Sequence, residues 1–352
     1  VMLDASALLT LQALGRLKSL TKRFAKVHVA TATFEKFSEE LGKLRSFAAS
    51  TGSLGYEEGR IQLIEVGPEV HVQKIAILDE IVSFLESDAV ALEGLDAKSW
   101  ADWQARKEPG LEAWIMHPLL MAKANSWALY CDEHGIRSLA QQSHGVRGFS
   151  TQALLRVLVD RAILDDGEYC RAVIKLVGMN FDFVSLSLND FQRHLADSGY
   201  VRTEVFRKLL RQLQSSAYTD EKSAWILGGV MARLWFERSG DAHDRVEWIG
   251  LCLDSLNSAR EPELAILQLL AAAGAQFSHF PEAFTALAHF CCDSPRLKPE
   301  HREIVGKLSF KIVELIAASS TRIPQPAVGA RWNTMLTWLR RKRQVVANNQ
   351  DE

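Results

Sequence analysis

The stretch Val1-Met2-Leu3-Asp4-Ala5-Ser6-Ala7-Leu8-Leu9 decides the fold of the N-terminal half of this chain. Its first three residues are apolar and indicate a short, fully buried strand. Asp4 follows where that strand would end, and small residues then lead into a helix with apolar periodicity through Leu14. In open parallel sheets, ligands bind outside the carboxyl ends of the strands, so an acid here is placed for chemistry. Aspartate is also a favoured helix N-cap, and this stretch alone leaves both interpretations open.

Strand and helix patterns alternate along the residues that follow. Residues 27–30 indicate a second short strand, and a helical pattern over residues 34–47 comes after it. Residues 60–66 largely alternate polar and apolar side chains, as a half-buried strand does. This alternation of elements is typical of the α/β class. We therefore predict a parallel α/β/α sheet in which residues 1–3 and 128–131 are neighbouring or near-neighbouring inner strands.

The composition is that of an ordinary globular protein, with 352 residues, 47% hydrophobic and 24% charged side chains, and a formal net charge of −2. This balance excludes a global basic field for nucleic acid but leaves room for a local patch. The five cysteines form no CxxC pair, and their odd number favours a reducing, cytoplasmic compartment. The longest nearly apolar run, residues 264–277, is too short to span a bilayer. The chain opens with Val inside a strand pattern, which suggests a piece of a longer protein.

Several other enzyme classes lack their sequence motifs in this chain. No G-x-G-x-x-G follows a strand and no G-x-x-x-x-G-K-[ST] occurs, which argues against dinucleotide and P-loop nucleotide binding. No G-x-S-x-G elbow is present, and the histidines belong to no recognisable Ser or Cys nucleophile motif.

Residues 1 to about 195 resemble the PIN-domain nucleases, and four segments carry the resemblance. The opening strand, acid and helix look like the first motif of that family, and the segment around Glu35 looks like its second. The helix containing Glu112, 20 residues before the next acid, is similar to the third motif. Tyr130-Cys131-Asp132-Glu133 is similar to the fourth. Residues 145–155 also resemble the strand-to-helix ending of some bacterial PIN-like proteins.

The resemblance implies a metal-dependent ribonuclease built as a parallel sheet between helices. In the family, acids gather at the carboxyl edge of the sheet and hold Mg²⁺ or Mn²⁺. Such hard cations take oxygen ligands, and a bound metal can turn water into a nucleophile. The implied metal ligands are Asp4, Asp132 and Glu133, and which of the last two is the ligand stays open. The implied catalytic acids are Asp4, Glu35, Glu112, Asp132 and Glu133.

Three features depart from the family pattern. Pro118 lies six residues after Glu112, so the third helix is expected to kink or to start anew there. Ser150 and Thr151 stand after the last strand, where many members carry a further acid. Residues 88–110 are interpreted as an irregular insertion with a helical turn around its tryptophans. These departures support an alternative, a catalytically degenerate PIN-like scaffold that binds RNA or protein without cutting.

From about residue 200 the strand signals stop, and helical patterns follow one another. We predict a nuclease-like domain at 1–195, an all-helical domain of about seven helices at 196–343 and a disordered tail at 344–352. The last predicted helix, residues 332–343, ends in the basic run Arg340-Arg341-Lys342-Arg343. Arrays of helix pairs usually bind partners on a surface.

The sequence thus predicts a Mg²⁺- or Mn²⁺-dependent endoribonuclease with an attached helical domain. RNA is the expected substrate, with single-stranded DNA as the second option. We expect the helical domain to bind a protein partner or to position the nuclease, and we expect no association with a membrane.

Overall fold

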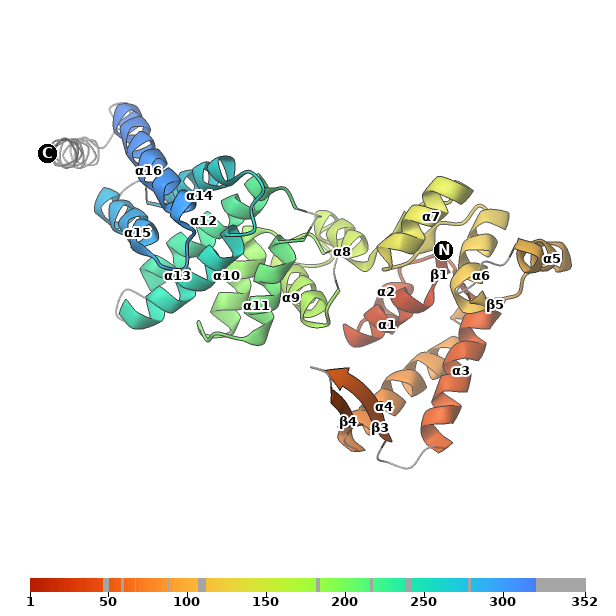
Figure 1. Cartoon of the computed structure of the whole chain (residues 1–352). Coiled ribbons are helices and arrows are strands. Elements are labelled where there is room, and N and C mark those ends of the chain that lie inside the picture. Colours follow the sequence, from red (N-terminus) through yellow and green to blue (C-terminus); the bar gives the residue numbers. More distant parts are fainter. Residues whose placement is uncertain are drawn as a thin grey trace, which may run out of the picture. The chain divides into compact units, whose positions relative to one another are not determined.

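The computed structural model divides the chain into two compact units, Val1–Asp165 and Asp166–Glu352 (Figure 1). The boundary between these units is defined by contacts between residues. The boundaries at residues 195 and 343 were predicted from the extent of the family resemblance and of the helical pattern, and they stay predictions. The predicted helix at 332–343 and the predicted tail at 344–352 lie outside the described residues. The structure describes residues 1–46, 51–57, 60–66, 68–87, 89–106, 112–181, 184–215, 218–237, 242–277 and 280–320.

A five-stranded parallel sheet lies at the centre of the first unit and confirms the predicted α/β class. Its strand order is β5-β2-β1-β6-β7, and every neighbouring pair is parallel. The predicted inner strands β1 and β6 are direct neighbours, with Met2 opposite Leu129. Strands β1, β2 and β6 are buried throughout, as expected where helices cover both faces of a parallel sheet. The five strands are β1 (Met2–Leu3), β2 (Val27–Ala30), β5 (Val90–Glu93), β6 (Leu129–Tyr130) and β7 (Gly148–Phe149).

Helices flank this sheet. Helix α6 packs over β1, β2 and β6 and also contacts α3, while α1 contacts α4 and α8. The described helices of this unit are α1 (Ala5–Ala13), α2 (Leu17–Thr21), α3 (Thr31–Ser46), α4 (Pro68–Leu85), α5 (Ala97–Arg106), α6 (Ala113–Ala124), α7 (His134–His144) and α8 (Thr151–Asp160).

Helix α6 continues through Pro118, where the sequence predicted a kink or a new segment. Proline has no N–H, so the carbonyl four residues earlier, that of Trp114, lacks its usual helical donor. The hydroxyl of Thr33 on α3 donates a hydrogen bond to this carbonyl at 3.3 Å. This tertiary contact compensates for the proline, and the helix begins at Ala113 with Glu112 as its N-cap residue.

The described part of residues 88–110 is mostly regular rather than the predicted irregular insertion, and the helical turn predicted around its tryptophans is present within helix α5. Residues 90–93 are β5, an edge strand paired with β2, and helix α5 follows. The ring of His28 on β2 and the carboxylate of Glu93 are joined by a hydrogen bond of 2.9 Å. A four-residue strand that includes alanine and glutamate has weak β propensity, which is why the sequence pattern missed it.

The strand predicted at residues 60–66 exists, but it lies outside the parallel sheet. It is β4 (Arg60–Val66), and it pairs antiparallel with β3 (Thr51–Glu57) in a separate two-stranded sheet. Period-2 alternation identifies a half-buried strand without identifying its partner, so the sequence did not distinguish the two sheets.

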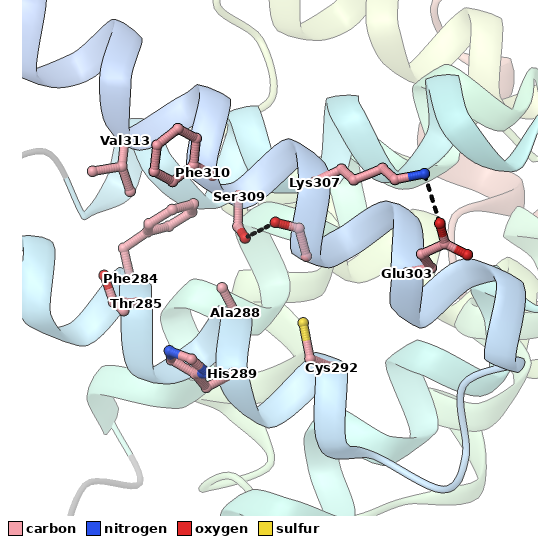
Figure 2. A pocket seen from close by; sticks show the side chains of 11 residues that line it. Phe284, Thr285, Ala288, His289, Cys292, Glu303, Lys307, Ser309, Phe310 and Val313 are labelled. Carbon is pink, nitrogen blue, oxygen red and sulfur yellow. Dashed lines mark hydrogen bonds and ion pairs between the residues drawn. The ribbon is translucent and has the colours of Figure 1, made fainter. Parts of the chain in front are cut away.

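The regular elements among the described residues of the second unit are all helices, as predicted. Gly228 lets α12 and α14 approach closely, since a Cβ there would collide with the backbone of Leu269. Helices α15 and α16 leave a pocket of about 400 Å³ between them (Figure 2). No helix in the described parts of the chain is long and apolar enough to cross a membrane. The helices are α9 (Asp166–Gly178), α10 (Leu188–Asp197), α11 (Glu204–Leu213), α12 (Asp220–Glu237), α13 (Ala242–Leu256), α14 (Pro262–Gln276), α15 (Pro281–Asp293) and α16 (Pro299–Ser320).

Candidate metal centre

Asp4 lies directly after β1 and begins α1 as its N-cap. One of its carboxylate oxygens accepts hydrogen bonds from the Ala7 N–H at 2.9 Å and from the Ser6 hydroxyl at 2.8 Å. Its own N–H donates to the carbonyl of Tyr130 at 3.1 Å, which extends the pairing of β1 with β6. The residue is only 7% exposed. The two interpretations left open by the sequence therefore describe one side chain, a capping carboxylate buried at the carboxyl end of the sheet.

Asp132 occupies the corresponding position after β6, with one residue between it and the strand. Thr151, the first residue of α8, donates to both carboxylate oxygens, from its N–H at 2.7 Å and from its hydroxyl at 2.6 Å. The Thr151 hydroxyl also lies 2.8 Å from the hydroxyl of Tyr130. The Thr151 hydroxyl has one proton and donates it to the Asp132 carboxylate, so Tyr130 is the donor in the hydrogen bond between the two hydroxyls. Asp132 is thus oriented by the start of the helix that follows β7.

The hydroxyl of Ser6 joins the two acidic segments. It donates to Asp4 and accepts from the N–H groups of Asp132 at 2.8 Å and Glu133 at 3.3 Å. One side chain of α1 therefore holds the backbone that follows β6 against the carboxylate that follows β1. The Ser6 hydroxyl thus ties the two strand ends to each other.

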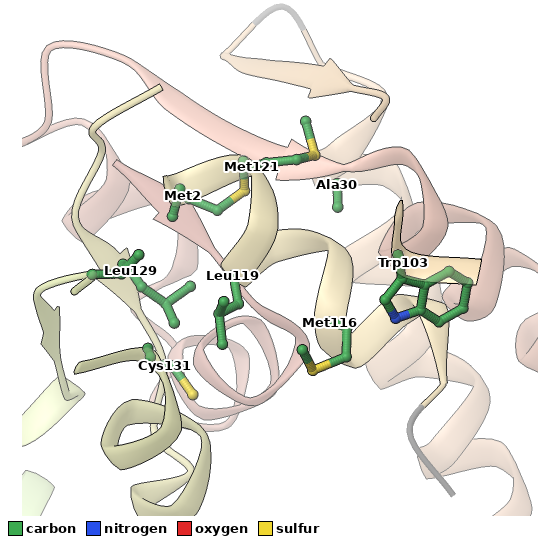
Figure 3. Close-up of a cluster of buried hydrophobic side chains, with 11 residues drawn as sticks. Met2, Ala30, Trp103, Met116, Leu119, Met121, Leu129 and Cys131 are labelled. Carbon is green, nitrogen blue, oxygen red and sulfur yellow. The ribbon is translucent and has the colours of Figure 1, made fainter. Parts of the chain in front are cut away.

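The sheet beneath these residues is apolar on the face that α6 covers (Figure 3). Met2 and Leu129 are fully buried there, and Cys131 extends the same face of β6 toward the site. Leu119 of α6 packs into this cluster and is also fully buried. Few water molecules can reach the inner side of the acidic pair, so both carboxylates are poorly solvated.

Poor solvation sets the electrostatics of the pair. Burial raises the pKa of Asp4 to about 6, and the nearby charge of Asp132 adds to this rise, while hydrogen bonds from Cys131, Ala7 and Ser6 oppose it. Burial also raises the pKa of Asp132 above its ordinary value, against the two hydrogen bonds from Thr151. Clustered carboxylates resist ionising together, and a cation would relieve that cost.

Glu133 has a different environment from its neighbour. It is exposed, and it precedes α7 as the N-cap residue without making a side-chain cap bond. Arg137, one turn into α7, donates to the carbonyl of Cys131 at 2.6 Å. Of the two adjacent acids, it is Asp132 that the fold brings beside Asp4.

Glu35 and Glu112 are exposed side chains. Glu35 was expected in the first turn of its helix, but α3 already begins at Thr31, so Glu35 lies in the second turn. Glu112 precedes α6, and its carboxylate accepts a hydrogen bond from the indole N–H of Trp114 at 2.6 Å. The structure thus brings together Asp4, which is buried, and Asp132, which is half-buried, and leaves Glu35 and Glu112 exposed.

A comparison with known protein families covers this part of the chain. Residues 2–142 match the family described as the PIN domain associated with the TPR-GreAB-C-PIN system. The first unit carries a PIN domain. The matched residues include β1, Asp4, β6 and Asp132 and end inside α7, before β7 and Thr151. No curated protein and no solved structure matched the chain.

The PIN domain offers a cation the buried carboxylate of Asp4 and the half-buried carboxylate of Asp132. Among the described residues, no group of three or more His, Cys, Asp or Glu side chains is placed to hold a metal ion. Mg²⁺ does not require such a group, because it usually keeps several waters and binds through one or two carboxylates and substrate phosphates. Each carboxylate oxygen has two lone pairs, so the hydrogen bonds from Ser6, Ala7 and Thr151 leave acceptor capacity. The hard oxygens of Asp4 and Asp132 therefore fit a divalent cation.

Sequence reasoning did not assign a role in the site to Ser6 or Thr151. Ser6 was interpreted only as a small residue leading into the first helix, although it lies two positions after Asp4. Thr151 was considered only together with Ser150, as a residue standing where many PIN domains carry a further acid. The structure shows Ser150 as the N-cap of α8, which leaves the Thr151 side chain free to turn toward Asp132. A hydroxyl residue directly after a capping serine is a weak signal, and only the tertiary structure shows its target.

Proposed function

We propose that the PIN domain is an endoribonuclease that depends on Mg²⁺ or Mn²⁺, and that Asp4 and Asp132 hold the ion. The two carboxylates at the carboxyl edge of the sheet, Asp4 buried and Asp132 half-buried, support this proposal. A residue that only capped α1 would work nearly as well as serine or asparagine, without a buried charge. Two neighbouring acids with raised pKa values at the carboxyl edge of the sheet favour a functional site over a purely structural cap.

The residues of this chain would hold and orient the ion's ligands. A divalent ion bound there would supply a water of lowered pKa and stabilise the charge that develops on the phosphate. Asp4, with a pKa of about 6, is mostly ionised at neutral pH, and Thr151 fixes the direction of the Asp132 carboxylate. Glu133 is proposed as a further acid of the site because its N–H shares the Ser6 hydroxyl with that of Asp132.

Glu35 and Glu112 are proposed as outer acids of the same site. The family resemblance motivates this assignment, since both stand in segments that look like PIN motifs. Their exposure suits contacts with water around a bound ion rather than direct coordination by a buried carboxylate.

RNA is the proposed substrate, and single-stranded DNA is the second option. The helical unit is proposed to bind a protein partner or to position the nuclease, because arrays of packed helices usually act through their surfaces. A cytoplasmic location is proposed as well, since all five cysteines carry free thiols, which suits a reducing compartment.

A cleavage assay on the full chain tests this proposal. The substrates are unstructured RNA and single-stranded DNA, each with Mg²⁺, Mn²⁺ or a chelator. We expect metal-dependent cleavage of RNA, and we expect Asp4→Asn and Asp132→Asn each to lower the rate by about a hundredfold or more. Asp96→Asn is the matched control, because this aspartate also caps a helix start, through Ser99, but is exposed. Equal cleavage by wild type and Asp4→Asn would contradict the assignment of Asp4.

The alternative is a PIN domain that binds RNA or protein without cutting. Thr151 favours it, because its hydroxyl and N–H stand beside Asp132 at the end of a strand where many PIN domains carry another acid. Under this alternative, the wild type binds RNA with the same affinity with and without Mn²⁺ and yields no product. Metal-dependent product formation decides for the nuclease.

A further inference from the structure

The side chain of Trp100 on α5 is an exposed aromatic ring that the chemistry proposed for the two acids does not use. Trp100 is 42% exposed, whereas Trp103, one turn further along the same helix, is only 8% exposed. Trp103 packs with Met116 of α6 in the apolar cluster beneath the site (Figure 3). Tryptophan side chains are highly buried on average in folded proteins. Trp103 therefore anchors α5 to α6, and packing against the core does not account for Trp100.

The Trp100 ring is supported from one side although it is exposed. Its centroid lies 5.3 Å from that of Trp103 at an interplanar angle of 42°, and 5.1 Å from that of His117 at 81°. His117 is buried and also lies edge-to-face against Trp103, with 5.1 Å between the ring centroids. Two buried rings thus hold the indole in place. A side chain that is fixed in advance loses little conformational entropy when a flat ligand stacks on it.

Helix α5 starts at the carboxyl edge of the parallel sheet. Strand β5 is parallel to β2, β1 and β6, so its carboxyl end at Glu93 lies at the same edge as Asp4 and Asp132. Only three residues separate Glu93 from α5, and Trp100 lies in the first turn of that helix. Neighbouring strands are about 4.8 Å apart, so β5 lies about 10 Å from β1 and about 14 Å from β6. Trp100 is therefore on the same side of the PIN domain as the two acids.

A hydrogen bond between two other helices supports this placement. Thr33 lies in the first turn of α3, which follows β2 directly, and its hydroxyl donates to the carbonyl of Trp114 in the first turn of α6. His117, one of the rings that support Trp100, lies one turn further along α6. The start of α6 and the Trp100 ring thus lie toward the carboxyl end of β2, which is the strand between β5 and β1.

An exposed indole held near a site proposed to cut RNA favours an unpaired nucleobase as its ligand. Stacking on an aromatic side chain suits any base, because every base has a π-face. Lys98 is exposed in the same turn of α5 and adds a positive charge for a neighbouring phosphate. The exposed carboxylate of Asp96 at the start of α5 offsets this charge, so stacking rather than charge supplies most of the affinity at this position.

We propose that Trp100 stacks on an unpaired base of the RNA strand that Asp4 and Asp132 act on, and so directs that strand along the carboxyl edge of the sheet. This inference rests on the proposed function, from which it takes RNA as the ligand, but the stacking itself requires neither metal nor cleavage. Loss of the ring weakens the binding of substrate and transition state equally. It should therefore raise KM and leave kcat unchanged.

Binding is measured without cleavage, on the full chain, by fluorescence anisotropy of a short labelled oligouridylate. The measurements are made with a chelator, and again with Mg²⁺ in proteins that also carry Asp4→Asn. We expect Trp100→Ala to raise Kd about tenfold, equivalent to ~1.4 kcal/mol, as expected for the loss of one stacked base. Trp225→Ala is the matched control and should leave Kd unchanged, because Trp225 on α12 of the helical unit is similarly exposed, at 47%.

Two further variants separate stacking from packing within the domain. Trp100→Phe retains an aromatic face and should keep most of the affinity, whereas Trp100→Leu retains only apolar contacts and should bind as weakly as Trp100→Ala. Oligouridylates with a single abasic position identify the stacked base. The wild type should lose affinity at one such position, and Trp100→Ala should lose nothing more there, since a ring and a base in contact are energetically coupled.

The outcomes distinguish this inference from the proposed nuclease activity. Equal Kd values for wild type and Trp100→Ala overturn the stacking, and so does a Trp100→Leu variant that binds as tightly as wild type. Absence of RNA binding under both conditions overturns the stacking and the proposed function together. Binding that depends on Trp100, in a chain that yields no product with Mg²⁺ or Mn²⁺, supports the stacking and contradicts the proposed cleavage.

Discussion

Asp4→Asn should stabilise the metal-free PIN domain at neutral pH. Burial raises the pKa of Asp4 from an ordinary value of 3.8 to about 6. The stability that this carboxyl contributes is fully present below pH 3.8, where it is protonated in both the folded and the unfolded chain. It is lost as the pH rises through 6, because folding then requires a buried charge. A shift of about two units corresponds to about 3 kcal/mol.

The asparagine keeps the shape of the side chain and removes the charge. Its amide oxygen can still accept the bond from the Ala7 N–H, and asparagine is as good an N-cap as aspartate. We therefore expect the free energy of unfolding to be about 3 kcal/mol higher in the variant above pH 7, and equal in the two proteins near pH 4. Added Mn²⁺ should make the two proteins nearly equal in stability at a hundredfold excess over the dissociation constant of the wild type, where only the wild type gains ~2.7 kcal/mol, and should reverse the order at a thousandfold excess, where it gains ~4.1 kcal/mol.

Hydrogen exchange of peptides containing β1 and β6, measured across a urea series, reports the stability of the PIN domain separately from that of the helical unit. The series is run with a chelator at pH 4, 5, 6 and 7.5. Asp96→Asn is the control with the opposite sign, since hydrogen bonds from Ser99 lower the pKa of this exposed carboxyl. A variant at position 4 that is less stable than wild type at pH 7.5, or that differs by the same amount at every pH, would refute the reasoning.

Two further substitutions test particular contacts. Thr151→Val removes the hydroxyl that donates to Asp132, so the pKa of that carboxyl should rise further and Mn²⁺ should stabilise the variant only at higher pH. Melting curves recorded with Mn²⁺ at pH 6 and pH 8 check this expectation. Thr151→Ser is the control, because serine retains the hydroxyl that donates to Asp132. Gly228→Ala places a Cβ 2.9 Å from that of Ala272 and against backbone of α14, and should cost the helical unit about 1–3 kcal/mol in urea unfolding. Gly42→Ala in α3, where nothing lies within 4 Å, should instead stabilise the first unit by about 0.5–1 kcal/mol.

The parallel sheet could be predicted from the sequence because its inner strands are apolar throughout and end in acids. Residues 1–3 and 128–131 carry that pattern, and β1 and β6 are indeed neighbours. Strand β5 could not be predicted, because its edge position leaves it half-exposed and its side chains are not those of a buried strand. Likewise, the unbroken course of α6 through Pro118 depends on a hydroxyl 85 residues earlier in the chain, at Thr33.

Part of the candidate site could likewise be predicted from the sequence, and part could not. Asp4 could be identified as a candidate site residue from its place after a strand, and the choice between Asp132 and Glu133 could not be made from the sequence. That choice depends on Thr151, which follows the next strand and turns one acid inward. Propensity and periodicity describe neighbours along the chain, whereas a bond between the ends of two strands is decided by packing.

Hydrogen bonds of the Ser6 hydroxyl hold the two acidic strand ends together. Ser6 accepts from two N–H groups that follow β6 while it donates to Asp4, so the two strand ends keep their relation when either carboxylate loses its charge. A cleaving PIN domain and a degenerate one would therefore share this fold and these hydrogen bonds. What separates them is whether a divalent cation binds the two poorly solvated carboxylates and offsets their charge. The response of stability to Mn²⁺, compared between wild type and Asp4→Asn, is for this reason a more direct test of function than any further comparison of shape.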